Sequence, residues 1–216
     1  MNDRTGKLRL GVLISGGGTT LQNIAECIAR HELPAEIACV IASNVQAYGL
    51  VRAERLGLAR HVVSRRDFAT AEAFSEHVAE VLRGAKVHLV CMAGYLSLWR
   101  IPADFLPSPP TAPRVMNIHP ALLPKFGGKG MHGLHVHAAV LAAGEKESGC
   151  TVHFADNQYD HGPIIVQRLC PVLAGDTPET LAQRVFAEEC RAYPEAIRLY
   201  AEGRLKVVDG NVETTG

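Results

Sequence analysis

Short apolar runs alternate with amphipathic stretches along the first half of the chain. The runs have the length of buried strands, and the stretches carry apolar residues at the three- and four-residue spacing of a helix face. Strands that alternate with helices in this way predict right-handed strand–helix–strand units and a parallel sheet. We therefore expect an α/β fold, with an open, mostly parallel, twisted sheet and helices on both faces. The expected strands are 8–14, 37–42, 61–63, 87–92 and 114–117, and the expected helices are 21–28, 50–56 and 71–82.

Two further strand-like segments, residues 150–154 and 163–169, are separated only by a turn. Such spacing favours an antiparallel pair, so we expect an antiparallel strand near the C-terminal end of the sheet. Five prolines between residues 102 and 113 predict an irregular connector and not a domain linker, because another strand follows at once. We expect a single domain over residues 1–206 and a polar C-terminal tail over 207–216.

A long final helix is predicted by the signals at its start. Asp176 is typical of an N-cap, Pro178 is tolerated in a first turn, and Glu179 lies three residues after the cap. The helix should end near Ala201, with a bend at Pro194, because an internal proline removes a backbone hydrogen bond.

The composition is ordinary for a soluble globular protein, with 47% hydrophobic and 20% charged residues among 216. Lysine and arginine number 22 and are balanced by 22 acidic residues, which argues against nucleic acid or a membrane as a partner. No apolar run approaches the ~18 residues of a membrane span, and the N-terminus has no signal-peptide pattern, so we expect a cytoplasmic protein. Six scattered cysteines indicate reduced core residues.

The segment Asn117-Ile118-His119-Pro120 follows an apolar run at the predicted end of a strand. Pro120 biases His119 toward extended geometry, in which side chains two residues apart point the same way. Asn117 and His119 would then place an amide donor beside a titratable imidazole at the carboxyl end of a strand, where open α/β sheets bind ligands. The alternative is that both side chains only satisfy the backbone of the next loop.

A glycine-rich run, Ser15-Gly16-Gly17-Gly18-Thr19-Thr20, lies between the first strand and the first helix. Glycines let a ligand approach the backbone, and a helix N-terminus offers free N–H groups to an anion. A dinucleotide loop would need Gly or Ala at Leu21 and an acidic residue where Ser43-Asn44 stands, and an ATP-binding loop would need Gly-Lys-Ser/Thr. The pattern favours a single phosphate monoester, with a glycine turn that binds nothing as the alternative.

Ten histidines raise the question of a metal site, because His132, His135 and His137 lie close together. Their spacing is not a recognised ligand pattern. On a helix, His135 and His137 would point about 200° apart, since each residue turns by ~100°. We therefore expect no metal.

Two carboxylates are candidates for a functional role. Asp160, in a turn before a strand, would raise the pKa of a nearby histidine and favour an imidazolium that stabilises an oxyanion beside Asn117. Aspartate is common in turns for local reasons, so Asp160 alone indicates little. Glu189 falls on the inward stripe of the final helix, where it must pair with an arginine, bind ligand hydroxyls or reach solvent at the edge of the stripe.

The runs 12–22, 116–124, 149–154 and 160–165, together with the final helix, resemble the phosphoribosylglycinamide formyltransferases, a folate-dependent family of purine synthesis. The Asn-x-His-Pro segment and the downstream Asp-x-Gly-Pro are typical of the wider formyl-transfer fold, and the Ser-Gly-x-Gly loop narrows the resemblance to this family. The resemblance covers residues 8–206 and implies a Rossmann-like formyltransferase fold.

The resemblance implies a reaction and a catalytic trio. The formyl group of the co-substrate 10-formyltetrahydrofolate would pass to the glycine amine of 5-phosphoribosylglycinamide in de novo purine biosynthesis. Catalysis falls on Asn117, His119 and Asp160. Attack by the amine forms a tetrahedral oxyanion, which Asn117 and a His119 kept protonated by Asp160 would stabilise. The proton would move from the amine to the folate nitrogen through His119 or a water held by Asp160.

The resemblance also implies binding residues. The phosphate contacts are Gly18, Thr19 and Thr20, the ribose contact is Glu189, and the folate contacts are Leu96, Ser97, Leu98, Trp99 and Asn117. Both partners are small molecules, no metal is implied, and the protein would be a monomer or a homodimer.

The sequence departs from the family's usual pattern at four places. Thr20 stands where asparagine is usual, and its hydroxyl can still donate. The folate segment reads Leu96-Ser97-Leu98-Trp99 where Met-Arg-Ile-Leu is common, and an arginine that approaches the folate falls near Ala71. The segment 126–133 is longer than the usual loop, so we expect part of a mobile flap with Lys129 as a candidate contact.

Three other functions share parts of this pattern. A formyltetrahydrofolate deformylase uses the same trio with water as acceptor, but usually carries an N-terminal regulatory domain and lacks the phosphate loop. A methionyl-tRNA formyltransferase would add a C-terminal tRNA-binding domain and a basic surface, for which this chain ends too early. A catalytically silent module that binds a phosphate compound would not need Asn117, His119 and Asp160. We expect the transferase.

Overall fold

The structure, a computed structural model, describes residues 6–106 and 111–215. Residues 107–110 of the expected proline-rich connector and the first five residues of the chain, where we expected no signal peptide, lie outside the described part. The chain divides into two compact units, Met1–Met116 and Asn117–Gly216, and each is described by itself.

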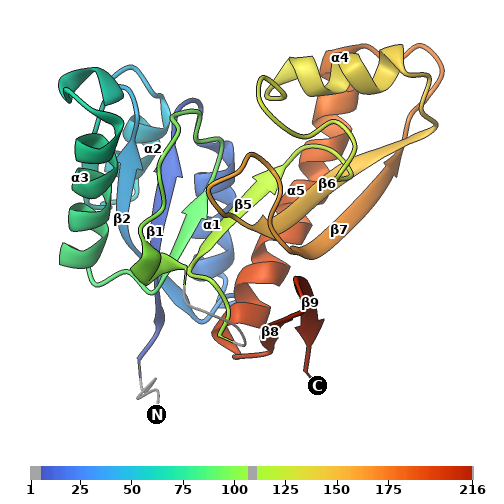
Figure 1. The fold of residues 1–216 in the computed structure, drawn as a ribbon. Coiled ribbons are helices and arrows are strands. Elements are labelled where there is room, and N and C mark those ends of the chain that lie inside the picture. Colours follow the sequence, from blue (N-terminus) through green and yellow to red (C-terminus); the bar gives the residue numbers. More distant parts are fainter. Residues whose placement is uncertain (1–5, 107–110, 216) are drawn as a thin grey trace. The chain divides into compact units, whose positions relative to one another are not determined.

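The N-terminal unit consists of parallel strand–helix–strand units (Figure 1). Strand β1 pairs in parallel with β2 and β4, and β2 pairs in parallel with β3. Because β2 and β3 are added on one side of β1 and β4 on the other, right-handed crossovers place α1 and α2 on one face and α3 on the opposite face. The elements are β1 (Leu8–Ile14), α1 (Thr19–Ala29), β2 (Ala35–Ala42), α2 (Gly49–Arg55), β3 (Arg60–Val62), α3 (Ala71–Gly84) and β4 (Leu89–Met92), with short 3-10 turns at Arg65–Asp67 and Ala103–Phe105.

The central strands β1 and β4 are almost entirely buried, as expected for strands that helices cover on both faces, whereas the edge strand β3 is exposed. Helix α3 buries Phe74, Val78 and Leu82 against the sheet. Gly11 allows this close packing, since a Cβ there would lie only 2.5 Å from Cδ2 of Leu82. The helix begins at a side-chain cap, in which Thr70 Oγ1 accepts the N–H of Ala73 at 3.1 Å.

The C-terminal unit places helices beside an antiparallel strand pair. Strand β5 (Val115–His119) enters this unit at Asn117. The expected antiparallel pair is confirmed, with β6 and β7 paired from Glu147 opposite Pro171 to His153 opposite Ile164, and the register shifts once, between Val152 and His153. Helix α5 packs against both strands and against α4. The elements after β5 are α4 (Leu134–Ala142), β6 (Glu147–Phe154), β7 (Ile164–Pro171), α5 (Pro178–Ala201), β8 (Leu205–Val208) and β9 (Asn211–Thr214).

Two local expectations in the C-terminal unit need correction. The N-cap of α5 is Thr177 and not Asp176, because Thr177 and Thr180 exchange side-chain and backbone hydrogen bonds in a capping box. Asp176 instead pairs with Arg184 at 2.7 Å. The segment after Lys206 is an antiparallel hairpin and not a plain polar tail, and Asp209-Gly210, both with positive φ, forms its two-residue turn.

The strand order confirms the expected fold class. Over the described ranges, seven strands are hydrogen-bonded in the order β3-β2-β1-β4-β5-β6-β7, and β8-β9 form a separate sheet. The main sheet is open and mostly parallel, with its antiparallel strand at the C-terminal end. None of the helices in residues 6–106 and 111–215 is long and apolar enough to cross a membrane.

Candidate functional site

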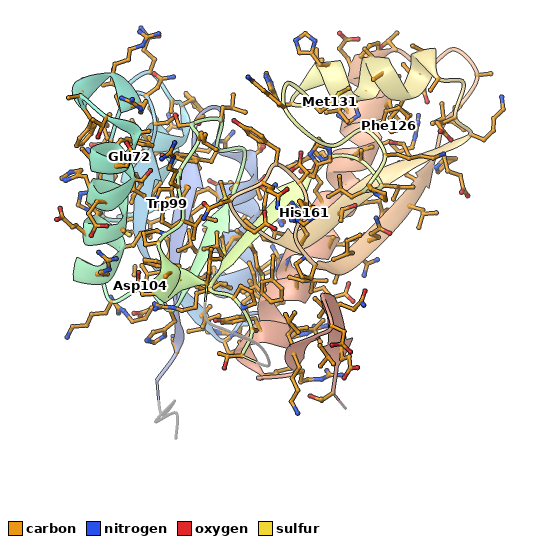
Figure 2. All side chains as sticks on the ribbon, in the orientation of Figure 1. Glu72, Trp99, Asp104, Phe126, Met131 and His161 are labelled. Atoms are coloured by element: carbon orange, nitrogen blue, oxygen red, sulfur yellow. The ribbon has the colours of Figure 1, made fainter. Side chains whose placement is uncertain are left out.

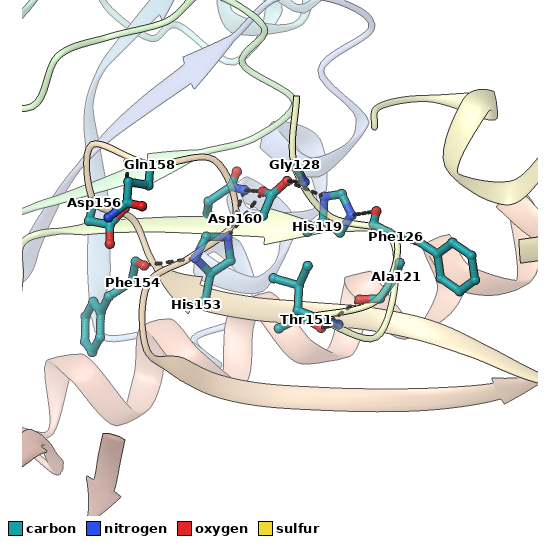
Figure 3. Close-up of polar contacts among 12 residues, drawn as sticks. His119, Ala121, Phe126, Gly128, Thr151, His153, Phe154, Asp156, Gln158 and Asp160 are labelled. Atoms are coloured by element: carbon teal, nitrogen blue, oxygen red, sulfur yellow. Dashed lines mark hydrogen bonds and ion pairs between the residues drawn. The ribbon is translucent and has the colours of Figure 1, made fainter. Parts of the chain in front are cut away.

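Three of the residues singled out in the sequence, Asn117, His119 and Asp160, meet in the C-terminal unit. Figure 3 shows two of them, His119 and Asp160. Asn117 and His119 alternate along the end of β5, and Asp160 lies in the turn between β6 and β7. Asn117 Nδ2 is 3.4 Å from Asp160 Oδ1, and His119 Nδ1 is 3.5 Å from Asp160 Oδ2. Both distances are long for hydrogen bonds. The structure thus brings together an amide, an imidazole and a carboxylate.

The Asp160 carboxylate is held by the surrounding loop. Its side chain is only 11% exposed, and the backbone N–H of Gly128 donates to Oδ2 at 2.9 Å. Gly127 permits this approach, because a Cβ there would lie 3.2 Å from Asp160 Cβ and 2.6 Å from Leu123 Cδ2. Burial raises the pKa of Asp160, but His153, His119 and the Gly128 N–H outweigh it and keep the pKa below its usual range. Asp160 is therefore an anion at neutral pH.

His119 has a defined tautomer in this structure. Its Nε2 lies 2.8 Å from the carbonyl oxygen of Phe126, and since a carbonyl only accepts, Nε2 carries the hydrogen. Nδ1 is then the nitrogen that faces Asp160. The side chain is 4% exposed, and burial lowers the pKa of His119 more than Asp160 and the Phe126 carbonyl raise it. Burial outweighs the carboxylate, so this arrangement favours a neutral His119 over the expected protonated form.

His153 is a member of this cluster that the sequence reasoning did not assign to it. Its Nδ1 lies 2.9 Å from the carbonyl oxygen of Phe154, so Nδ1 carries the hydrogen and Nε2 accepts. Asn117 Nδ2 donates to that Nε2 at 3.1 Å, which orients the amide. The available signal was a histidine inside the apolar run 150–154, because a buried polar side chain must find partners.

The other histidines do not form a metal site in the described residues. On α4, His135 is exposed and His137 is buried, as their spacing on a helix predicts. The rings of His132 and His135 lie 5.7 Å apart. No group of three or more His, Cys, Asp and Glu within residues 6–106 and 111–215 is arranged to hold a metal ion.

The glycine-rich run forms a tight turn at the start of α1 in the N-terminal unit. Gly18 has φ 72° and packs against α2, where a Cβ on Gly18 would lie 2.6 Å from the Cα of Gly49. Gly16 and Gly17 face open space, since a Cβ on either would meet nothing within 4 Å. No side chain caps α1, so its first N–H groups remain available to an anion. Arg52 adds a cation beside the turn and donates from Nε to the Gly17 carbonyl at 2.9 Å.

The segment 96–99 divides into exposed and buried side chains. Leu96 and Leu98 are 61% and 49% exposed, which is unusual for large apolar residues and leaves an apolar surface after β4. Trp99 is buried inward of α3 (Figure 2), where its Nε1 donates to the Ser75 carbonyl at 3.0 Å. Its ring packs edge-on against Phe105. The Trp99 indole therefore anchors the segment.

Glu189 lies on the inward stripe of α5, as expected. The stripe residues Leu181, Val185, Tyr193 and Ile197 are fully buried, and Glu189 is half-buried among them. Burial raises the pKa of Glu189 to about 7. Burial, helped by the nearby Glu189, also raises the pKa of Cys150 on β6 to about 12. Glu189 makes no ion pair within the described residues, which argues against an arginine partner. The other two expected alternatives remain: contact with ligand hydroxyls, or contact with solvent at the edge of the stripe.

Comparison with known proteins decides the family. The sequence pattern of the family described as formyl transferase matches residues 8–197, across both units. The chain belongs to the formyl transferase family. This formyl transferase is 35% identical over 201 residues to the phosphoribosylglycinamide formyltransferase of Haemophilus influenzae, covering 93% of this chain and 91% of that protein.

A longer relative contains a similar segment. The trifunctional purine biosynthetic protein adenosine-3 of Drosophila pseudoobscura pseudoobscura is 41% identical over 202 residues, and the formyl transferase spans 14% of its length. The matching part is thus one segment of a multifunctional protein.

Solved structures agree with this assignment. The glycinamide ribonucleotide transformylase 1 of Symbiobacterium toebii superimposes with a TM-score of 0.89 at 43% identity, over 99% of this chain and 96% of that one. A formyltetrahydrofolate deformylase of Pseudomonas syringae has a TM-score of 0.84 at 22% identity, over 98% of this chain and 67% of that one. The second likeness shows a shared fold alone, so the fold does not separate transfer from hydrolysis.

Proposed function

We propose that this formyl transferase moves the formyl group of 10-formyltetrahydrofolate to the glycine amine of 5-phosphoribosylglycinamide in de novo purine biosynthesis. The observation that carries the proposal is the meeting of Asn117, His119 and Asp160 in a chain whose relatives of matching length are named for this reaction. An amide donor, a base and a carboxylate are the groups that acyl transfer to an amine requires.

In the proposed mechanism, the amine nitrogen attacks the formyl carbon and the formyl oxygen becomes an oxyanion. His119 Nδ1 takes a proton from the amine, because Nε2–H is already bound to the Phe126 carbonyl. The imidazolium that forms is stabilised by Asp160 and, with the Asn117 amide, stabilises the oxyanion. Collapse of the intermediate breaks the bond to the folate nitrogen, which receives the proton from His119. His119 is thus neutral at the start and protonated in the intermediate.

For the ribonucleotide, we assign the phosphate to Gly18, Thr19 and Thr20. The uncapped N-terminus of α1 supports this assignment, because its N–H groups and the positive end of the helix dipole favour an anion. We assign the ribose to Glu189. A carboxyl group with a pKa near 7 both donates to and accepts from sugar hydroxyls in its neutral form, and it lacks a competing cation.

For the folate, we assign contacts to Leu96, Ser97, Leu98, Trp99 and Asn117. The exposed Leu96 and Leu98 offer an apolar surface to a flat ring, and the buried Trp99 keeps the segment in place and contributes its backbone. We further propose small-molecule partners only, no metal, a single domain over residues 1–206, a monomer or homodimer, and a cytoplasmic location.

One assay separates the transferase from its nearest rival. The purified protein is mixed with 10-formyltetrahydrofolate, with and without glycinamide ribonucleotide, and release of tetrahydrofolate is followed. Release that requires the ribonucleotide supports the transferase. Release at the same rate without it would instead identify a deformylase, and no release would leave only a binding module.

A further inference from the structure

Ser15 follows the last residue of β1 and is the first residue of the glycine-rich turn, and its hydroxyl makes two close contacts in the N-terminal unit. The backbone N–H of Leu96 donates to Ser15 Oγ at 2.8 Å, and Ser15 Oγ lies 2.6 Å from Ser43 Oγ. Backbone hydrogen bonds connect the same three segments: Ser15 N–H donates to the Gly94 carbonyl at 3.1 Å, and Ser43 N–H donates to the Ile14 carbonyl at 3.0 Å. The hydroxyl pair therefore joins the carboxyl ends of β2, β1 and β4.

The role of Ser15 Oγ is fixed in one of its two contacts. The Leu96 N–H can only donate, so Ser15 Oγ must accept from it, and the contact with Ser43 uses the Ser15 hydrogen or its second lone pair. Leu96 lies beyond the last residue of β4, so a side chain holds its N–H where a strand would otherwise do so. Ser43 is the residue that occupies the place of the acidic group in a dinucleotide site, and here it supplies the second hydroxyl.

We propose that Ser15 is a positioning residue that holds the glycine-rich turn and the segment 96–98 in one fixed arrangement, so that a single hydroxyl serves the binding of both substrates. This inference rests on the proposed function, in which the turn binds the ribonucleotide phosphate and the segment binds folate. The two binding segments begin within one or two residues of the atoms that Ser15 joins. Because Ser15 is not one of the reacting groups, its loss acts on binding and not on the chemical step.

The experiment measures kcat and both KM values for Ser15→Ala and Ser43→Ala. Ser15→Ala is expected to raise the KM for the ribonucleotide and the KM for the folate by about tenfold each, with kcat within about twofold, because two hydrogen bonds of ordinary strength are lost. Ser43→Ala removes one of the two and is expected to raise both KM values by about threefold.

Ser75→Ala is the matched control. Ser75 Oγ accepts the backbone N–H of Arg100 at 3.0 Å, so this variant loses a hydrogen bond of the same kind to the same stretch of chain. It is expected to lower the melting temperature as Ser15→Ala does and to leave the KM for the ribonucleotide unchanged.

Two results would overturn the inference: a Ser15→Ala enzyme in which either KM is unchanged, or a Ser75→Ala enzyme in which the ribonucleotide KM rises as much. If Ser15→Ala does not fold, Ser43→Ala decides by the same two criteria. A wild-type protein that transfers no formyl group contradicts the proposed function and this inference with it, whereas unchanged KM values in active Ser15→Ala contradict the inference alone.

Discussion

The glycine-rich turn and the Asp160 cluster are built on opposite physical plans. The turn, residues 15–20, offers backbone N–H groups at a helix N-terminus, and its small residues serve to keep side chains out of the way. The cluster offers side chains of Asn117, His119, His153 and Asp160, which come from β5, β6 and the following turn. The two histidines are buried, and the other two residues are partly buried. The first plan suits holding a charge with fixed dipoles, and the second suits setting the protonation state of side chains through burial.

This difference suits the two proposed tasks. A phosphate needs a stationary positive field, which a helix N-terminus supplies at every pH. Proton transfer needs a group whose pKa is set by its neighbours, and in the cluster the two effects on His119, burial and the Asp160 charge, oppose one another. We therefore expect substitutions that distort the backbone to impair the turn most, and substitutions that remove a charge to impair the cluster most.

Removing the charge of Asp160 should have the largest effect. Asp160→Asn keeps the shape but no longer stabilises the imidazolium, so kcat is expected to fall by about 100-fold or more. Because Asp160 raises the pKa of His119, its loss should also move the acidic limb of the kcat/KM profile to lower pH. Steady-state kinetics between pH 5 and 9 measure both.

The neighbouring loop aspartate provides the control. Asp156 pairs at 2.8 Å with the exposed His161 and not with the buried cluster, so Asp156→Asn should change KM at most. A full kcat in Asp160→Asn would remove the carboxylate from the mechanism, and an equal loss in Asp156→Asn would show that only the charge of the loop matters.

The sequence predicts the turn better than the cluster, because the signals for the turn lie close together along the chain. The turn is local: β1, the glycines and α1 are consecutive, and their signals lie within a few residues, so strand, turn and helix are all predicted correctly. The two-residue alternation of Asn117 and His119 is equally local. Asp160 lies 43 residues from Asn117, and no pattern in the chain fixes that distance.

What the sequence missed has physical causes. The protonation state of His119 depends on its burial, which cannot be seen before the loop that carries Phe126 is placed over it. His153 was passed over because its role requires the position of Asn117, 36 residues away. The β8-β9 hairpin, in contrast, had a local signal in Asp209-Gly210 that was not used.

Gly18→Ala tests the backbone plan of the turn, with the second largest expected effect. An alanine must adopt φ near +72° with its Cβ 2.6 Å from the Gly49 backbone, so we expect a loss of about 2–4 kcal/mol in unfolding free energy. The displaced turn should raise the KM for the ribonucleotide by about 30-fold, as misplaced hydrogen-bond donors imply. Urea unfolding and steady-state kinetics measure the two effects.

Gly17→Ala is the matched control, because its Cβ would meet nothing within 4 Å and its φ is not positive. Its stability should stay within about 0.5 kcal/mol of the wild type. Equal stabilities for the two variants would mean that the contact with Gly49 does not shape the turn. A raised ribonucleotide KM in a fully stable Gly17→Ala would move the phosphate toward Gly17.

Glu189→Gln should stabilise the protein and weaken the binding of the ribonucleotide. The pKa of Glu189 is raised to about 7, so its stabilising contribution is present below its unfolded value of 4.5 and is lost as the pH rises through 7. Glutamine stays neutral and avoids that loss, so at pH 8 the variant should gain about 2 kcal/mol over the wild type, and little of this gain should remain at pH 5. The KM for the ribonucleotide should rise by about tenfold, because glutamine lacks the hydroxyl donor.

Glu188→Gln is the comparison on the preceding residue, because Glu188 makes an ion pair with Arg191 at 2.9 Å, whereas Glu189 makes none within the described residues. It should show no gain in stability at pH 8. Urea unfolding of the wild type and both variants at pH 5 and pH 8 decides, and a gain for Glu189→Gln that does not depend on pH would rule out the charge as its cause.

Arg52→Ala should have the smallest effect, and it asks whether the turn relies on any side chain. Arg52 stacks over Tyr48 with its guanidinium 5.3 Å from the ring centroid and donates to the Gly17 carbonyl, so its loss removes one hydrogen bond and a nearby positive charge. If the turn binds through its backbone, as proposed, the ribonucleotide KM should rise by only about threefold, and high salt should narrow the difference from wild type. Arg55→Ala, which removes a charge from the same helix without touching the turn, should leave the KM for the ribonucleotide unchanged.

A hundredfold rise of that KM in Arg52→Ala would mean that a side-chain cation, and not the helix N-terminus, dominates phosphate binding. The two regions would then differ in location and not in physical plan.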